Sequence, residues 1–352
     1  MDTVTDTATD TATGTQVGAD PARLRAHLDE HHPGLLTGTP EIELIQGGRS
    51  NLTYLVRDGG RAWVLRRPPL GHVPATAHDM GREATVLGAL AASDVPVPRI
   101  VATCDDPDVL GAPFYLMERV DGTVCRTTED TRTLDPAAAR AVSFALVDVL
   151  ARLHAVDPEA VGLGGFGRPA GFLQRQVRRW TGQLQDVRGR EIPGIDELGR
   201  RLAADVPENP TAAIVHGDYR LDNVLVAPDL SVAAVLDWEL ATLGDPLADL
   251  GMLVGYWDGV PGPLRAVVTK GIDPALGFPS SVEIVERYRR RTGSDLGRLS
   301  WYVAFGLFKM AVIREGIHVR HQRGDTVGDG FIGVGDLVAP LVEQALTTLG
   351  EA

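Results

Sequence analysis

Three polar side chains, Asp218, Asn223 and Asp237, lie at the ends of apolar runs that are expected to form strands. Asp218 and Asn223 are in the polar turn between the runs 212–215 and 224–226. Asn223 comes five positions after Asp218, and an apolar run over residues 232–236 leads directly into Asp237. Transfer of a phosphoryl group requires a carboxylate that holds the attacking hydroxyl, together with oxygen ligands that hold Mg²⁺ on the phosphates. We therefore predict that Asp218 is the catalytic base and that Asn223 and Asp237 bind the metal ion. Turn chemistry alone is the alternative, but it explains one such turn more readily than two.

The spacing of these residues matches a known catalytic loop. Protein kinases carry H-R-D-x-x-x-x-N followed by D-F-G, and this chain carries His216-Gly217-Asp218 and Asn223 followed by Asp237-Trp238. With Gly217 and Trp238 at these positions, the chain resembles the aminoglycoside phosphotransferase and choline kinase group, which phosphorylates small molecules. The resemblance extends over about residues 42–341. It is closest to the branch that is fused or adjacent to acyl-CoA dehydrogenases, as in Val64-Leu65-Arg66-Arg67-Pro68-Pro69 and Phe305-Gly306-Leu307-Phe308-Lys309.

The resemblance implies an α+β protein-kinase-like fold with two lobes, a small β-rich N-terminal lobe and a larger, mainly helical C-terminal lobe. It also implies use of a Mg²⁺-nucleotide. Arg220 stands where protein kinases place a lysine that meets the transferring phosphate, and an arginine can stabilise that charge with several donors. An ordinary surface arginine is an equal alternative. His216 is expected to support the loop rather than to take a proton.

A glycine pair lies between two expected strands in the segment Gln46-Gly47-Gly48-Arg49-Ser50-Asn51. Glycines allow the backbone to approach phosphates closely. We therefore expect the nucleotide phosphates to be bound by Gly47, Gly48, Ser50 and Asn51. A simple hairpin turn would show a similar pattern.

The strand after this segment ends in Arg66, where the related kinase strand ends in lysine. Glu83, on the helix that follows, is the natural partner for an ion pair that would position this cation on the α- and β-phosphates. Arginine keeps the positive charge but is bulkier than lysine. The same arginine is a feature of the branch that the chain resembles.

The segment from Phe114 to Val120 resembles the connector between two kinase lobes. Its backbone, at Glu118 and Val120, is expected to bind the edge of an adenine base; an edge strand is the alternative. This organisation predicts a disordered tail over residues 1–19, a nucleotide-binding lobe over 20–118 and a catalytic and acceptor-binding lobe over 119–352.

Hydrophobic periodicity predicts the elements that position these residues. Asp20-Pro21 is expected to start the first helix, and Asp58-Gly59-Gly60 to form a hairpin turn. Asp245, with Pro246 next, is expected to start another helix, with Asp245 and Asp249 in structural roles. Strands are expected over 41–45, 52–56, 62–65, 99–103 and 114–117, and helices over 79–92, 136–154, 170–185, 281–291, 299–320 and 336–349.

The composition is ordinary for a globular enzyme, with 44% hydrophobic and 23% charged residues among 352. A net charge of −13 argues against nucleic acid as the main partner. The sequence shows no stretch long enough to span a membrane and no signal-peptide pattern, so no membrane association is expected. Cys104 and Cys125 are the only cysteines, which favours the cytoplasm.

The charge is unevenly distributed. Residues 261–324 carry eleven Lys or Arg against five Asp or Glu, so the rest of the chain carries −19. Either this segment is a solvated helix face, or some of its cations face an anionic ligand. Five basic residues on or after the expected helix 299–320 are candidates for the second role: Lys309, Arg314, His318, Arg320 and Arg323.

We therefore predict a phosphotransferase that uses Mg²⁺ and ATP, with GTP not excluded, and that acts on a hydroxyl of a small molecule. Aminoglycosides are polycations, so the positive charges favour an anionic acceptor such as a hydroxyacyl-CoA-type compound. An aminoglycoside or macrolide kinase is one alternative. A nucleotide-binding pseudokinase that acts through a partner protein is another, and Arg66 is its motivation. The acceptor and the oligomeric state stay open at this point.

Overall fold

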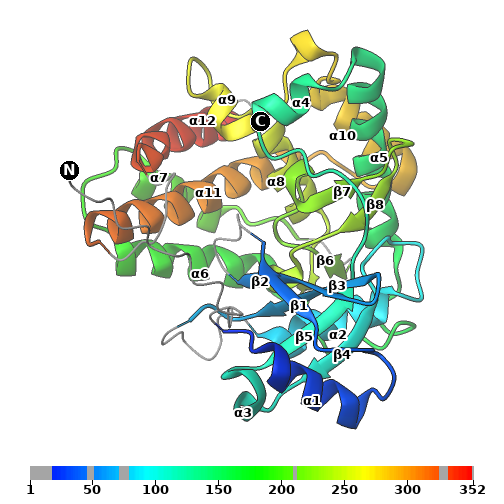
Figure 1. The fold of residues 1–352 in the computed structure, drawn as a ribbon. Helices are drawn as coiled ribbons and strands as arrows, with labels where there is room; N and C mark the ends of the chain where they lie inside the picture. Colours follow the sequence, from blue (N-terminus) through cyan, green and yellow to red (C-terminus); the bar gives the residue numbers. More distant parts are fainter. Residues whose placement is uncertain (1–17, 46–50, 71–78, 209–211, 325–331, 351–352) are drawn as a thin grey trace, which may run out of the picture. The chain divides into compact units, whose positions relative to one another are not determined.

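The computed structural model describes residues 18–45, 51–70, 79–208, 212–324 and 332–350 (Figure 1). Gly47, Gly48, Ser50 and nearly all of the expected disordered tail lie outside these ranges. The chain divides into two compact units. The N-terminal unit contains residues 1–85 and 99–119, and the C-terminal unit contains residues 86–98 and 120–352. None of the described helices combines the length and the apolar character that crossing a bilayer requires.

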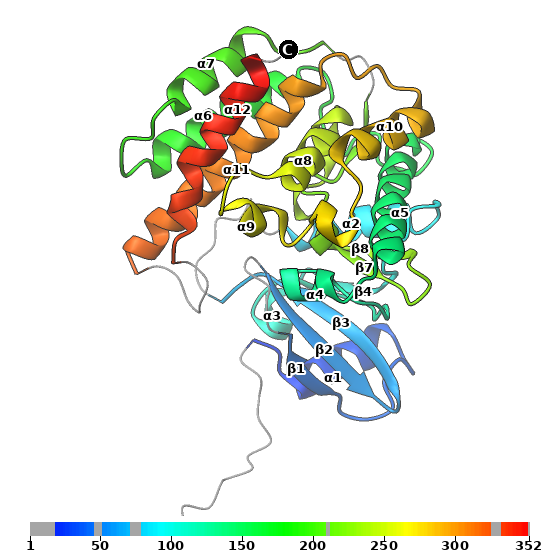
Figure 2. The same ribbon diagram turned by 90° about the horizontal axis from the view of Figure 1, so that it is seen from above.

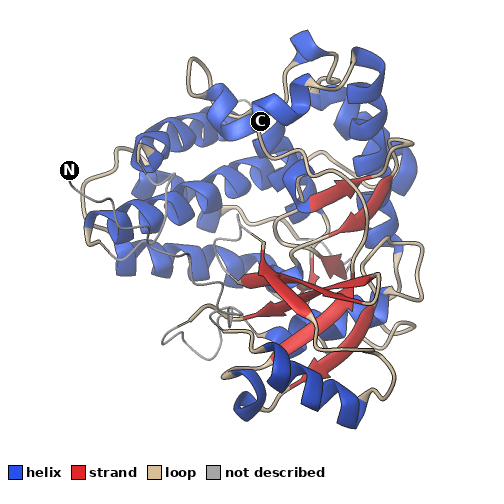
Figure 3. Ribbon diagram, in the orientation of Figure 1, coloured by secondary structure: helices blue, strands red, loops and turns tan. Residues whose placement is uncertain are grey.

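The N-terminal unit is built on a five-stranded antiparallel sheet in the order β1-β2-β3-β5-β4 (Figure 3). Its elements are β1 (Glu41–Leu44), β2 (Leu52–Asp58), β3 (Arg61–Arg67), β4 (Ile100–Cys104), β5 (Phe114–Glu118), α1 (Pro21–His31) and α3 (Pro107–Leu110). Gly59 and Gly60 have φ of 56° and 81°, so they form the tight turn between β2 and β3 that was expected.

One face of this sheet is covered by α1, whose Leu24 and Leu28 join a core with Tyr54, Trp63 and Leu65. The Asp20 side chain accepts hydrogen bonds from the first turn of α1, which confirms the expected helix start. Side chains alternate across a strand, so β3 turns Trp63 and Leu65 toward this core and Arg66 toward the other face. The next helix, α2 (Met80–Leu90), begins in the N-terminal unit and ends in the C-terminal unit.

The C-terminal unit is mainly helical (Figure 2). Its further helices are α4 (Thr128–Arg132), α5 (Pro136–Ala155), α6 (Phe172–Val187), α7 (Ile195–Ala204), α8 (Leu247–Asp258), α9 (Arg265–Thr269), α10 (Ser281–Thr292), α11 (Leu299–Gln322) and α12 (Val338–Gly350). Short 3₁₀ turns occur at Leu221–Asn223, Trp238–Leu240, Pro274–Leu276 and Val334–Leu337. The last of these turns replaces the first part of the helix that was expected over 336–349.

Two short antiparallel strand pairs lie among these helices. The strands are β6 (Ala213–Val215), which pairs with β9 (Thr242–Gly244), and β7 (Val224–Val226), which pairs with β8 (Val232–Val235). The three apolar runs around the predicted catalytic residues therefore form strands, as expected. α7 and β9 were not expected from the sequence.

α11 runs through the helical unit and packs against α6, α8 and α12. It approaches α8 closely because both helices carry glycine where they cross. A Cβ atom on Gly251 would lie 2.4 Å from the carbonyl carbon of Tyr302, and one on Gly306 would lie 3.1 Å from the Cα of Met252. This crossing fixes the position of α8 and α11 relative to each other, and both helices contact the catalytic loop.

Replacing Gly251 by alanine should therefore destabilise the protein, because backbone atoms of α11 would have to move. We expect Gly251→Ala to cost at least about 1–3 kcal/mol of unfolding free energy, measured by urea titration. Gly88→Ala in α2 is the matched control, because a Cβ there meets nothing within 4 Å. That change should stabilise the protein by about 0.5–1 kcal/mol. Equal effects of the two substitutions would contradict the crossing.

Candidate active site

The loop between β6 and β7 holds Asp218 and Asn223 against each other. The Asn223 amide nitrogen donates to the backbone oxygen of Asp218 at 2.9 Å and to its Oδ2 at 3.1 Å. Asn223 is 8% exposed and closes a 3₁₀ turn that leads into β7. Because its amide nitrogen is occupied by Asp218, the side-chain oxygen of Asn223 is the atom that is suited to a cation.

The β7–β8 hairpin brings Asp237 to the same place. Val224 is opposite Val235, and the backbone N–H of Leu236 donates to the carbonyl oxygen of Asn223 at 2.8 Å. Asp237 therefore follows directly beside Asn223, in a left-handed conformation with φ of 66°. Such a conformation is uncommon for a residue with a side chain and is found at functional sites. The structure thus brings together the three residues that the sequence singled out.

The available oxygen atoms fit a hard cation. An amide oxygen and a carboxylate are ligands that Mg²⁺ accepts, and in nucleotide sites it takes one or two such protein ligands together with phosphate oxygens. In the part of the chain that the structure describes, no group of three or more His, Cys, Asp or Glu residues could hold a metal. A cation held by Asn223 and Asp237 would therefore complete its coordination with ligand or water oxygens.

The Asp218 carboxylate lies among cations and hydrogen-bond donors. Its Oδ2 is 3.3 Å from Arg220 Nε, and Tyr256 donates to its Oδ1 at 3.3 Å. Burial acts to raise the pKa of Asp218, but the charges of Arg220 and Lys309 hold that pKa below its ordinary value. Burial raises the pKa of Tyr256 to about 12, so its hydroxyl stays protonated and can donate. Asp218 is therefore ionised near neutral pH and can accept a hydrogen bond from a hydroxyl.

Arg220 lies at the site rather than on the open surface. Its Nε is also 3.0 Å from Asp222 Oδ1, and its guanidinium lies 4.8 Å from the centre of the Tyr256 ring. Its side chain is 23% exposed. The sequence left open whether Arg220 is an ordinary surface residue, and the structure places it in contact with Asp218.

Asp249 of α8 holds the start of the catalytic loop. Its two oxygens accept the backbone N–H of His216 at 2.7 Å and of Gly217 at 2.8 Å. His154 lies 3.3 Å from the same carboxylate and hydrogen-bonds Tyr288 through its other ring nitrogen. Asp249 is 1% exposed. It has the structural role that the sequence analysis gave it.

Lys309 of α11 contacts the same loop from its other side. The ammonium donates to the carbonyl oxygen of Gly217 and lies 5.2 Å from the centre of the Trp180 ring. Lys309 is 7% exposed, so it is a buried part of the loop support. Of the other cations suggested as ligand-facing, Arg314 hydrogen-bonds Tyr256, His318 packs against Gly335, and Arg320 and Arg323 are exposed.

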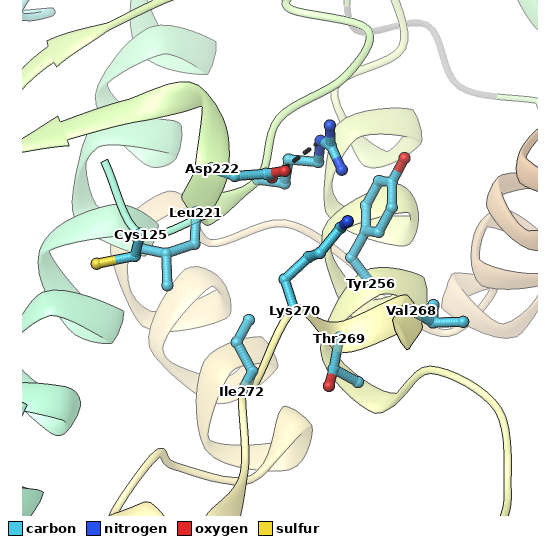
Figure 4. A pocket seen from close by; sticks show the side chains of 9 residues that line it. Cys125, Leu221, Asp222, Tyr256, Val268, Thr269, Lys270 and Ile272 are labelled. Carbon is cyan, nitrogen blue, oxygen red and sulfur yellow. Dashed lines mark ion pairs between the residues drawn. The ribbon is translucent and has the colours of Figure 1, made fainter. Parts of the chain in front are cut away.

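A pocket opens beside Arg220 and Tyr256 (Figure 4). Lys270 is at the end of α9 with φ of 53°, and its side chain points toward Tyr256 in Figure 4. The pocket joins apolar and charged side chains and is lined by Cys125, Arg220, Leu221, Asp222, Tyr256, Val268, Thr269, Lys270 and Ile272. Sequence spacing gave no indication of Tyr256 or Lys270, because both reach the site through tertiary packing of α8 and α9.

Within the basic segment 261–324, the arginines of α10 form ion pairs with carboxylates. In α10, Arg287 and Arg291 both pair with Asp148, while Arg289 and Arg290 pair with Glu286. The helix-face explanation of the positive charge therefore applies to α10. Lys270, Lys309 and Arg314 are the members of the segment that lie at the site described above.

In the N-terminal unit, the expected ion pair is present. Arg66 Nη1 lies 2.6 Å from Glu83 Oε1, and the two side chains are 12% and 1% exposed. Asn51 is buried, and the backbone N–H of Glu118 donates to the carbonyl oxygen of Arg99 at 2.9 Å. The C-terminal unit consists of two stretches of chain, residues 86–98 and 120–352, and Val120 is the first residue of the second stretch.

Fold and site together define a phosphotransferase of the protein-kinase-like class, and comparisons with known proteins agree. The chain matches the phosphotransferase enzyme family over residues 41–282 and belongs to that family. A solved structure from Ralstonia eutropha JMP134, provisionally described as an aminoglycoside phosphotransferase, is 35% identical. It has a TM-score of 0.81, over 95% of this chain and 99% of that one. A thermostable mutant of aminoglycoside phosphotransferase APH(4)-Ia shares the fold, at 17% identity and a TM-score of 0.63 over 94% of this chain and 100% of that one.

Similar curated proteins include human acyl-CoA dehydrogenase family member 11, which is 34% identical over 336 residues. That alignment covers 93% of this chain and 43% of the human protein. Mouse acyl-CoA dehydrogenase family member 10 is 34% identical over 325 residues, which are 90% of this chain and 30% of that protein. The chain thus spans less than half the length of these curated relatives.

The support that Asp249 gives to the loop predicts a large effect of a small change. In Asp249→Asn the side-chain NH₂ group would face a backbone N–H, so one buried donor would lose its acceptor. We expect a loss of about 1–3 kcal/mol of unfolding free energy, measured by urea titration at pH 7. Asp196→Asn, at a carboxylate that is 61% exposed, is the control and should change stability by less than about 0.5 kcal/mol.

The loss of unfolding free energy in Asp249→Asn should change with pH in a definite direction. Burial acts to raise the pKa of Asp249, but the hydrogen bond with His154 and the backbone N–H of His216 lower it overall. A lowered folded-state pKa gives stability above the ordinary carboxyl pKa of 3.8 that disappears as the pH falls further. The difference between wild type and Asp249→Asn should therefore shrink in acid. A difference that grows in acid would contradict this account.

Proposed function

We propose that the protein is a Mg²⁺- and ATP-dependent phosphotransferase that transfers the γ-phosphoryl group to a hydroxyl of a small molecule. The observation that carries this proposal is the placing of Asp218, Asn223 and Asp237 at one end of the β7–β8 hairpin. Family membership supports the reaction class. The APH(4)-Ia mutants were solved with ADP or AMP-PNP and hygromycin B, and aminoglycoside 2'-phosphotransferase-IIIa with GDP. ATP is thus the proposed donor, with GTP as an alternative.

In this mechanism Asp218 accepts a hydrogen bond from the acceptor hydroxyl and orients its oxygen for in-line attack on the γ-phosphorus. A bond forms between that oxygen and phosphorus, the bond to the β–γ bridging oxygen breaks, and ADP leaves. The hydroxyl proton passes to Asp218 and then to solvent. Asn223 and Asp237 would hold Mg²⁺, which neutralises phosphate charge when bound. Arg220 would stabilise charge on the transferring group.

The N-terminal unit would supply the nucleotide contacts. We propose that Arg66, held by Glu83, binds the α- and β-phosphates, and that the backbone at Glu118 and Val120 binds the adenine edge. The segment with Gly47, Gly48, Ser50 and Asn51 would cover the phosphates. A guanidinium has five N–H donors in a fork, so an arginine can pair with a carboxylate and bind a phosphate at the same time. Buried free thiols at Cys104 and Cys125 support a reaction in the cytoplasm.

We propose a hydroxyacyl-CoA-type acceptor. The names of the curated relatives refer to acyl-CoA, and the pocket beside Arg220 joins apolar side chains to Lys270. The positive charge of Lys270 suits an anionic part of an acceptor better than it suits a polycationic aminoglycoside. Structural neighbours that phosphorylate aminoglycosides and macrolides keep an antibiotic acceptor as the second candidate.

The first experiment measures ADP release with Mg²⁺-ATP over a panel of acceptors, with Asp218→Ala as the reference. The panel contains short and long hydroxyacyl-CoAs, aminoglycosides, macrolides, choline and simple sugars. We expect turnover with hydroxyacyl-CoAs and a loss of kcat of about 10²–10⁴-fold in Asp218→Ala, the usual contribution of a catalytic base. Nucleotide affinity should be unchanged.

The other outcomes of this experiment separate the alternatives. Turnover with aminoglycosides or macrolides alone would establish the antibiotic kinase. Nucleotide binding without turnover on any acceptor would favour the pseudokinase that Arg66 suggested. Turnover that persists in Asp218→Ala would show that Asp218 is not the catalytic base.

The pocket makes a separate prediction about affinity. Lys270→Ala should raise KM for anionic acceptors by about 10-fold or more, because a charge-assisted contact is worth about 1.5–3 kcal/mol. The value of kcat and the KM for ATP should stay within about twofold. Arg320→Ala, at an exposed position of α11, is the control for a general change in surface charge. An equal rise in KM in both variants would contradict a contact with Lys270.

A further inference from the structure

Gly217, the residue before Asp218, is held by polar contacts on both its N–H and its carbonyl side. Asp249 accepts the N–H of Gly217 at 2.8 Å, and Lys309 donates to the carbonyl oxygen of the same residue. Gly217 has φ of 86°, and a Cβ there would lie 2.8 Å from both the Cβ and the carbonyl oxygen of Leu240. The backbone at this point therefore has little room and two fixed polar partners. Its orientation sets the direction in which the Asp218 side chain leaves the loop.

Burying the charged side chain of Lys309 costs free energy, and a merely structural role does not require a charge. Its ammonium is buried between the Gly217 carbonyl and the face of Trp180, and burial lowers its pKa. A buried charge is usually less favourable than an apolar side chain of the same size. The glycine crossing of α8 and α11 already fixes this part of α11 without a charged side chain. The position of the cation, next to the proposed catalytic base, explains its presence better.

We propose that Lys309 is a positioning residue for phosphoryl transfer: it fixes the Gly217–Asp218 peptide and keeps a positive charge beside the Asp218 carboxylate. The proposal rests on the proposed function. Asp218 already contacts Arg220, Tyr256 and Asn223, which in the proposed function lie next to the acceptor, the metal and the nucleotide. Lys309 instead acts through the carbonyl oxygen of Gly217 and has no proposed contact with these ligands. It can hold the loop through a whole reaction cycle, whatever occupies the site.

Removal of Lys309 should lower kcat and leave binding intact. A misplacement of a reacting group by about 1 Å can cost about 100-fold in rate. We therefore expect Lys309→Met to lower kcat about 10–100-fold, with KM for ATP and for the acceptor within about twofold. Lys309→Gln, which keeps a donor for the Gly217 carbonyl but no charge, should recover part of the loss. Arg320→Met, on an exposed position of the same helix, should match the wild type in both constants.

Amide hydrogen exchange of the nucleotide-free full chain gives a readout that does not depend on turnover. The peptide amides of residues 216–219 should exchange faster in Lys309→Met than in the wild type, while those of β2 and β3 should not change. Lys309→Gln serves the same comparison if Lys309→Met does not fold.

Wild-type kcat in Lys309→Met, or unchanged exchange at residues 216–219, would overturn the proposal. A rise in KM with kcat unchanged would also overturn it, because Lys309 would then be a binding residue. If the proposed function is wrong, the wild type will show no turnover that Asp218→Ala removes. Amide hydrogen exchange will still test whether Lys309 supports the loop.

Discussion

The backbone of Gly217, held by Asp249 at its N–H and by Lys309 at its carbonyl oxygen, is the constraint on which the geometry of the site depends. Two helices that meet at a glycine crossing supply these partners, α8 through Asp249 and α11 through Lys309. A third element, the β7–β8 hairpin, is tied to the same loop by the backbone bond from Leu236 to Asn223. The packing of the helical unit therefore also determines where the catalytic side chains lie. A disturbance at the helix crossing can therefore reach Asp218 through the backbone of Gly217.

The carboxylates near this peptide differ because their surroundings differ. Cations at Arg220 and Lys309 hold the pKa of Asp218 below its ordinary value, against the effect of burial. The pKa of Asp222 is raised by burial, which the charge of Arg220 does not offset. Neighbouring acids whose pKa values are pushed apart are suited to different tasks. Asp218 is the member of this pair with the lowered pKa, which agrees with its proposed role as a carboxylate that accepts a hydrogen bond from a hydroxyl. Asp222 serves mainly as a partner that holds Arg220 at the site.

Local patterns in the sequence predicted those parts of the structure that local rules determine. The spacing from Asp218 to Asn223 and the apolar run before Asp237 gave the three central residues, because a hairpin register follows from the strands that form it. The N-cap at Asp20 and the turn at Gly59 and Gly60 were predicted from local rules, and the structure confirms them. The Arg66–Glu83 pair was predicted from the resemblance to kinases, and it is also present. α7 and β9 were missed, since short segments owe their structure to tertiary packing more than to periodicity. The places of Tyr256 and Lys270 and the contact of Lys309 with Gly217 depend on how distant helices cross, which no spacing along the chain specifies.

The residues found by the motif and those that line the pocket bear on different aspects of function. The residues that a motif reveals are those of the chemical step, and they are compatible with many acceptors because phosphoryl transfer needs the same base and metal ligands in each case. Three residues that line the pocket, Arg220, Leu221 and Asp222, belong to the catalytic loop. The others come from α8, from the end of α9 and the residues after it, and from Cys125, and none of these is part of the motif. In the proposed mechanism, changes at Lys270 or Ile272 would alter the acceptor without touching Asp218, whereas changes at Gly217 or Lys309 would alter the rate for every acceptor. Family membership therefore indicates the reaction class, whereas the acceptor has to be inferred from the residues that line the pocket.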